Sequence, residues 1–325
     1  MSDKPKEPDE TAWKGFLRKA KYQMGRGKNK NQYTDKTWPE MLSFALEDGF
    51  LGNYDEAIDI FDEILQYSYE RVDKGVRIDA FSAKATALDK LGRTDEALAT
   101  YDKAIELGSD QSHLYHNKGI LLSQLDRDSE ALVCFSKEIE LTKDYKKDDE
   151  EEVERYTDAL SALAEAHATM GTTNDLNIAL KLVDESIKLN PKSAYAFQTK
   201  AIILSDVLIE KYDEALENCE KGLKIDPTDE DLISLRALIY LNMEKYDLAE
   251  KQFLELLNHD PSEPSTHYNL ACIYSLLKNK QKAIDHLLVA TYLDPATIHS
   301  DMDEDESFDN IRDSEEFKRL QSVEV

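Results

Sequence analysis

The stretch GNYDEAIDIFDEIL at residues 52–65 places an alanine, Ala57, four residues before a large apolar residue, Phe61. An alanine in the same local context returns six more times along the chain, as Ala97, Ala131, Ala179, Ala215, Ala249 and Ala283. The last three are 34 residues apart, and so are the first two of these six. A fixed spacing in this range indicates one supersecondary unit copied along the chain, so we expect seven units.

A second column of small residues lies about twelve positions before these alanines, as the packing of helix pairs requires. Its members are Ala45, Ala85, Gly119, Ala164, Ala201, Ala237 and Ala271. A turn such as LGRT at 91–94 separates the two columns, so each unit is expected to be two antiparallel helices. Proline lacks the amide donor and ends a helix, and it follows the second helix of four units, at Pro191, Pro227, Pro261 and Pro295.

These columns resemble the tetratricopeptide repeat, a 34-residue helix pair with small, aromatic, alanine and proline positions in this order. The resemblance covers residues 38–298 and is strongest between Ser193 and Pro295. It implies an all-α fold, an α-solenoid of seven helix pairs with a C-terminal capping helix. We expect three segments: a basic N-terminal segment at 1–37, the seven-repeat array at 38–298, and an acidic hinge with a capping helix at 299–325. The charged stretch at 143–152 is expected to be a longer helix or a loop.

In this family the first helices of successive units line the concave face, and peptides bind along it. The resemblance therefore implies that the chain is a protein–protein interaction scaffold and no enzyme. The inward positions expected to contact a partner in units five to seven are Tyr195, Gln198, Ile202, Ser234, Leu238, Asn242, Tyr268 and Cys272. Those in units two to four are Ser82, Thr86, His113, His116, Ser161 and Glu165. Ile202 and Leu238 have an alternative role, which is to pack between units.

The clamp that some members of the family use to bind the carboxylates of heat-shock chaperones requires lysines on the first helices. Asn117 and Asn269 occupy its asparagine positions. The lysine positions hold Ser82, His116, Ser234 or Tyr268, so we do not expect this clamp.

The chain carries a formal charge of −27, but its first 37 residues contain ten Lys or Arg against five Asp or Glu. Acidity at this level repels nucleic acid and attracts a basic partner, so the expected partner is a protein or peptide that is basic or offers apolar anchors. The simpler alternative is that the acids only solvate the outer helix faces. Two further alternatives use the basic N-terminal arm: a nucleic-acid-associated protein, and an adaptor of an enzyme complex.

No run of 18 apolar residues is present, and the N-terminus has no apolar signal core. Cys134, Cys219 and Cys272 are far apart and without paired spacing, and the first two lie at core positions. We therefore expect reduced, buried thiols and a cytoplasmic protein without a membrane partner.

Acidic and hydroxyl residues alternate at 301–307 as calcium ligands do, but Glu306 replaces the loop glycine and Arg312 the bidentate glutamate. His113 and His116 share a helix face, yet no third ligand is apparent. The sequence contains no nucleophile motif or phosphate-binding glycine loop. We expect no metal, no cofactor and no catalytic residue.

Residues 11–24 place Trp13, Phe16, Leu17, Ala20 and Met24 on one helical stripe, with Lys14, Arg18, Lys19 and Lys21 around it. Apolar side chains of this size are rarely left in water. We expect this helix to dock on the first helix pair, near Trp38 and Phe44, with a neighbouring copy or another protein as the alternative.

Overall fold

The computed structural model describes residues 37–66, 72–205 and 211–321. In these three ranges it contains sixteen α-helices, one 3-10 helix and no strand. The all-α prediction is therefore confirmed. The predictions for residues 1–36, including the amphipathic helix at 11–24, lie outside the described residues.

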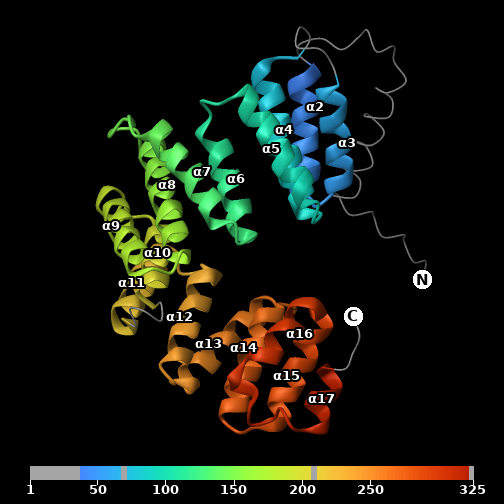
Figure 1. Ribbon diagram of the computed structural model, residues 1–325, viewed down its shortest axis with the longest axis vertical. Helices are drawn as coiled ribbons and strands as arrows, with labels where there is room; N and C mark the ends of the chain where they lie inside the picture. The colour runs from blue at the N-terminus through green and yellow to red at the C-terminus, as the bar shows by residue number, and fades with distance from the viewer. Residues whose placement is uncertain (1–36, 67–71, 206–210, 322–325) are drawn as a thin grey trace, which may run out of the picture. The chain divides into compact units, whose positions relative to one another are not determined.

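The helices follow one another as seven pairs and a C-terminal cap, the predicted arrangement (Figure 1). The first three pairs are α2 (Thr37–Phe50) with α3 (Tyr54–Leu65), α4 (Lys74–Lys90) with α5 (Thr94–Leu107), and α6 (Ser112–Gln124) with α7 (Asp128–Thr142). The next four are α8 (Glu150–Thr169) with α9 (Thr173–Leu189), α10 (Ala194–Ser205) with α11 (Tyr212–Ile225), α12 (Glu230–Asn242) with α13 (Tyr246–His259), and α14 (Pro264–Leu276) with α15 (Lys280–Leu293). The cap consists of α16 (Pro295–Glu304), η2 (Glu306–Phe308) and α17 (Glu315–Gln321).

The two alanine columns hold the pairs together. All seven alanines of the first column are 0% exposed, and all members of the second column are buried. Side chains this small let the two helix axes approach closely, while Phe61, Tyr101 and Phe253 fill the space beside them at 3% exposure or less. The packing role that the sequence predicted for both columns is confirmed.

The chain divides after Leu121 into two compact parts, which are described separately. In the N-terminal part, α2 packs on α3 and α4, and α4 packs on α5. Ile78, Ala104 and Leu114 form a small cluster that joins α4, α5 and α6. In the C-terminal part, first helices pack on the next first helix, as α8 does on α10, α10 on α12 and α12 on α14.

The charged stretch at 143–152 contributes both a loop and helix. Helix α7 ends at Thr142, and α8 begins at Glu150 and runs for 20 residues. Asp149 caps α8, because its side chain accepts a hydrogen bond from the backbone N–H of Glu152.

Turns between the two helices of a unit contain a residue in the left-handed backbone region. Glycine occupies it at Gly52, Gly92 and Gly171, with φ of 80°, 70° and 67°. Asp126, Glu244 and Lys278 adopt φ of 56°, 57° and 60° at the corresponding turns of units three, six and seven. A side chain in this region costs energy that glycine avoids, so these three turns carry backbone strain.

The C-terminal segment covers the apolar side of the last helix pair. Phe308, Phe317 and Met302 are 0% exposed and join one cluster with Leu287 and Ala290 of α15. Repeat arrays need a terminal element of this kind because the last unit has no following neighbour. The predicted capping helix is α17, in which Phe317 and Leu320 are buried as expected.

Cys134, Cys219 and Cys272 are buried and form no disulfide with one another, and the sequence predicted the burial of the first two. Burial raises the pKa of the Cys219 thiol to about 12. Of the helices in the described ranges, none has the length and apolar character needed to cross a bilayer.

Candidate functional site

A groove of about 630 Å³ lies in the N-terminal part, along the first helices of units one to three. We call it the N-terminal groove. It is lined by Ala45, Leu46, Gly49 and Phe50 of α2, Tyr54 and Phe61 of α3, Asp79, Ser82, Ala83, Thr86, Ala87 and Lys90 of α4, and His113 and Asn117 of α6. Its floor contains several small residues, which leave room between the larger side chains of the rim.

Two large apolar side chains on α2 reach the solvent in this groove. Phe50 is 92% exposed and Leu46 is 47% exposed. Met41, Leu42 and Ala45 of the same helix are buried in the first core cluster, so α2 contributes apolar side chains both to the core and to the groove. An exposed apolar face beside a cavity is typical of a surface that binds a partner.

Six of the fourteen residues that line the groove are polar or charged, and all six come from α4 and α6. The Thr86 hydroxyl lies 2.9 Å from the Tyr101 hydroxyl and donates to the carbonyl oxygen of Ser82 at 3.3 Å. Burial raises the pKa of Tyr101, although the contact with Thr86 opposes the shift. Asp79 is exposed and places one carboxylate at the groove.

The structure brings three of the predicted inward residues into this groove, Ser82 and Thr86 from α4 and His113 from α6. His113 lines it from α6, whereas His116 is half-buried on the same helix. Sequence reasoning missed Leu46 and Phe50. Leu42, Leu46 and Phe50 follow one another at intervals of four residues, the spacing of a buried stripe, so no sequence signal indicates that the last two are exposed.

The other predicted contact positions lie in the C-terminal part, on α10, α12 and α14. Gln198 is half-buried and Ile202 is 39% exposed on α10. On α12, Ser234 and Leu238 are half-buried and Asn242 is exposed. The role of these residues in binding stays a prediction.

Tyr195 joins two neighbouring first helices. Its hydroxyl donates to Glu165 Oε2 of α8 at 3.1 Å, and the Thr199 hydroxyl donates to Oε1 of the same carboxylate at 2.6 Å. Burial and the nearby Glu165 charge raise the pKa of Tyr195 well above its ordinary value. The hydroxyl of this predicted contact residue is therefore engaged within the chain.

Tyr268 and Cys272 on α14 contact the C-terminal segment of the same chain. The Tyr268 hydroxyl donates to Asp305 Oδ2 at 2.8 Å, and the Cys272 thiol lies 3.4 Å from the same oxygen. The Tyr268 ring meets Phe308 edge to face, with centroids 5.5 Å apart, and Cys272 is only 3% exposed. Burial raises the pKa of both Tyr268 and Cys272.

The segment around Asp305 is organised by Arg312. Its guanidinium donates to the carbonyl oxygens of Met302, Asp303 and Asp305 at 3.1, 2.9 and 2.7 Å. Asp305 also accepts from the backbone N–H of Ser307 at 2.8 Å. No group of three or more potential metal ligands occurs among the residues that the structure describes.

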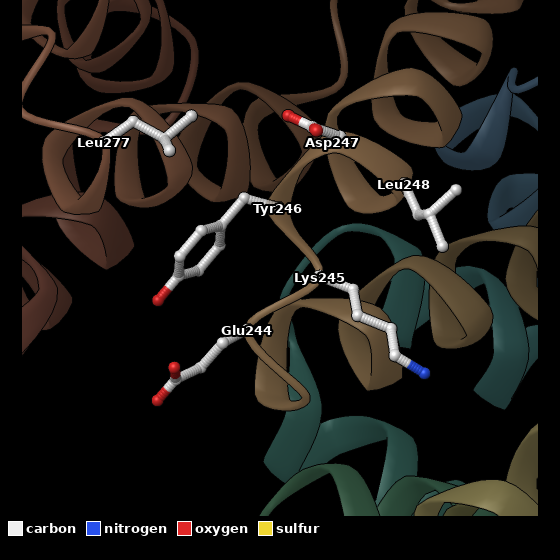
Figure 2. Close-up of a pocket in the computed structure, with 6 residues that line it drawn as sticks. All are labelled: Glu244, Lys245, Tyr246, Asp247, Leu248 and Leu277. Atoms are coloured by element: carbon white, nitrogen blue, oxygen red, sulfur yellow. The ribbon is translucent and has the colours of Figure 1, made fainter.

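A second hollow, of about 400 Å³, lies at the turn between α12 and α13 (Figure 2). It is lined by Glu244, Lys245, Tyr246, Asp247 and Leu248, with Leu277 from the end of α14. Figure 2 shows the side chains of Lys245 and Tyr246 extending in different directions.

Sequence models of the tetratricopeptide repeat match residues 78–110, 210–271 and 264–297. Among characterised proteins, Hsp70-Hsp90 organizing protein 1 of Glycine max is 32% identical over 84 residues, which are 26% of this chain and 14% of that protein. The chain therefore matches only a small portion of that relative.

Two solved structures extend the likeness over more of the fold. A tetratricopeptide repeat protein from Parabacteroides merdae aligns with a TM-score of 0.63 at 16% identity, covering 82% of this chain and 97% of that one. A thermophilic protein of the same kind from Thermus thermophilus aligns with a TM-score of 0.51 at 19% identity, covering 58% and 94%. At these identities the likeness concerns the fold alone.

Proposed function

Because this chain is a tetratricopeptide repeat protein, we propose that it is a non-enzymatic scaffold that binds a partner protein or peptide along the first helices of its repeats. The observation that carries the proposal is the N-terminal groove, with Phe50 92% exposed and Leu46 47% exposed beside a cavity of about 630 Å³. A groove lined mainly by apolar groups, with a few polar ones, suits the anchor side chains of a peptide.

The charge of the surrounding helices favours a basic partner. Residues 38–121 contain 17 Asp or Glu and eight Lys or Arg, a net charge of −9. The groove itself contains one carboxylate, Asp79, and one ammonium group, Lys90. We propose a partner segment with one or two large apolar anchors in the groove and basic residues at its flanks, which the acidic surface attracts at long range.

The positions predicted in the later units form a second part of the proposal. Gln198, Ile202, Ser234, Leu238 and Asn242 are half-buried or exposed on α10 and α12, so a partner can reach them. Tyr268 and Cys272 are held by Asp305, so a partner there would have to displace the C-terminal segment. We also propose a cytoplasmic location, which is supported by three buried cysteines that form no disulfide with one another.

The test is affinity capture from an extract of the source cell, followed by measurement of Kd for each captured protein. The groove variant carries Leu46→Ser and Phe50→Ser. The matched control carries Leu288→Ser and Tyr292→Ser, which are 57% and 84% exposed on α15. Both variants remove two exposed apolar side chains, so they have similar effects on solubility and folding.

We expect the groove variant to bind the partner about 30-fold more weakly or worse, because an aromatic anchor contributes about 2 kcal/mol or more. The control should bind as the unaltered chain does. A third variant, Ile202→Ser with Asn242→Ala, tests the surface of α10 and α12. Weakening by the third variant alone would place the site in the later units. Equal binding by all four proteins would refute both sites.

A further inference from the structure

We propose that residues 11–24 of this chain occupy the N-terminal groove in the free protein, so that a partner binds by displacing them. The displacement of this segment by a partner rests on the proposed function, whereas the docking of the segment in the groove does not. Self-occupation would cover the apolar surface that Leu46 and Phe50 leave exposed in the described structure. A monomer rarely keeps such a surface open to water without an occupant.

The apolar residues of the segment match the dimensions of the groove. Residues 11–24 form a helical stripe through Trp13, Phe16, Leu17 and Met24 in sequence. A helix of this length extends about 21 Å at 1.5 Å per residue. Three neighbouring first helices at the usual axis separation of about 8–10 Å span roughly the same length. One such helix can therefore cross α2, α4 and α6.

The chain between residues 11–24 and the groove is short, yet long enough for the segment to reach the groove. Residues 25–36 separate the stripe from α2, which begins at Thr37 and forms one wall of the groove. Twelve residues reach up to about 40 Å when extended, so the segment can fold back over α2 without a stretched chain. A tether of this length gives an effective concentration of about a millimolar. Even a weak intrinsic Kd of about 100 μM would then leave the groove about 90% occupied.

The charges of the two surfaces are complementary. The stripe is flanked by Lys14, Arg18, Lys19 and Lys21, whereas residues 38–121 carry a net charge of −9. The groove lining itself contains one carboxylate, Asp79, and one ammonium group, Lys90, so the attraction comes from the charge of the surrounding helices. Of the apolar surfaces described here, the N-terminal groove is the one that adjoins the end of this segment. A basic segment with apolar anchors is also the kind of partner proposed for the groove.

The experiment uses the fluorescence of Trp13 in the full chain. The sequence contains two tryptophans, so Trp38→Phe leaves Trp13 as the reporter. In this background we compare Phe50→Ser with the control Tyr292→Ser by emission wavelength and acrylamide quenching. We expect Trp13 to be blue-shifted and protected in the parent and the control, and to become red-shifted and accessible in Phe50→Ser.

Hydrogen exchange of residues 13–24 in the chain with both tryptophans gives the same information without the Trp38 substitution. Exchange at random-coil rates would overturn the proposal. So would protection that Phe50→Ser leaves unchanged, or protection that appears only as protein concentration rises, which would make a second copy the occupant.

Partner binding separates this inference from the proposed function. The double variant Trp13→Ser, Phe16→Ser should bind the partner about tenfold more tightly than the unaltered chain, since the competing segment is removed. Unchanged affinity here, with affinity lost in Phe50→Ser, would refute regulation and leave the proposed function standing. If Phe50→Ser releases Trp13 but does not change the affinity for the partner, the proposed function is refuted and the docking stands.

Discussion

Replacing Asp305 by alanine should loosen the C-terminal segment from the last repeat. The carboxylate accepts hydrogen bonds from the Ser307 N–H and the Tyr268 hydroxyl, each at 2.8 Å, and contacts the Cys272 thiol at 3.4 Å. A hydrogen bond to a charged group contributes about 1.5–3 kcal/mol. Because the carboxylate is only half-buried, partial hydration offsets part of this sum, and we expect a net loss of about 2–3 kcal/mol.

The assay is hydrogen exchange of the buried amides of the cap, at Phe308 and Ile311. A loss of this size increases the population of the open segment, so exchange should be about 30- to 150-fold faster. Asp301→Ala is the matched control, since Asp301 is exposed in the same segment. Equal exchange rates in the two variants would refute a role for Asp305 in holding the cap.

The effect should also depend on pH. Burial raises the pKa of Asp305, but the hydrogen bonds from Ser307, Tyr268 and Cys272 outweigh it, so the net shift is downward. The folded state therefore favours the carboxylate, and its contribution is present above the unfolded pKa of about 3.9. That contribution is lost as pH falls through the lower folded pKa. The difference between Asp305→Ala and the unaltered chain should shrink below about pH 4.

Other predictions concern the later units. Burial and the neighbouring His267 lower the pKa of His286, whose Nδ1 lies 3.0 Å from Nδ1 of His267. The unfolded state then binds more protons near its pKa of about 6.5, so denaturation should show stability falling from pH 7.5 to pH 5, and less so in His286→Gln. Lys278→Gly should raise the free energy of unfolding by about 1 kcal/mol, because it relieves a positive φ of 60°. Ala271→Leu should lower the melting temperature, since overpacking a 0% exposed site costs about 1–3 kcal/mol. The Cys219 thiol, with a pKa of about 12, should react with iodoacetamide at pH 8 only after denaturation.

The helix pairs could be predicted from the sequence because close helix packing requires small residues at regular intervals along the chain. A position such as Ala249, where two helices touch, admits only a small side chain, and this requirement returns with every copy of the unit. The cap could be predicted for a similar reason, since Phe317 and Leu320 lie on one face of a short helix.

The contacts of Tyr268 and the exposure of Phe50 could not be predicted in the same way. Asp305 lies 37 residues beyond Tyr268, in a segment outside the repeat, so no periodicity indicates that the two will meet. Phe50 follows the pattern of a buried helical residue, and its 92% exposure depends on which neighbours α2 has in space. An alignment of the units shows only the features that the units have in common. The Tyr268 contact occurs only at the C-terminal end of the array, and the exposed Phe50 only at the N-terminal end.

The stacking of first helices, each on the next, limits how far a local change is felt. In the C-terminal part, α10 packs on α8 and α12, and α12 packs on α10 and α14. Stability in such an array is a sum of units and of interfaces between neighbours, so a disturbance fades over one or two repeats. Mutations can therefore change the groove at α2 while the hydrogen bonds of Asp305 keep their geometry. Mutations around Asp305 can likewise leave the groove unchanged. Each end of the array is free to acquire its own specificity.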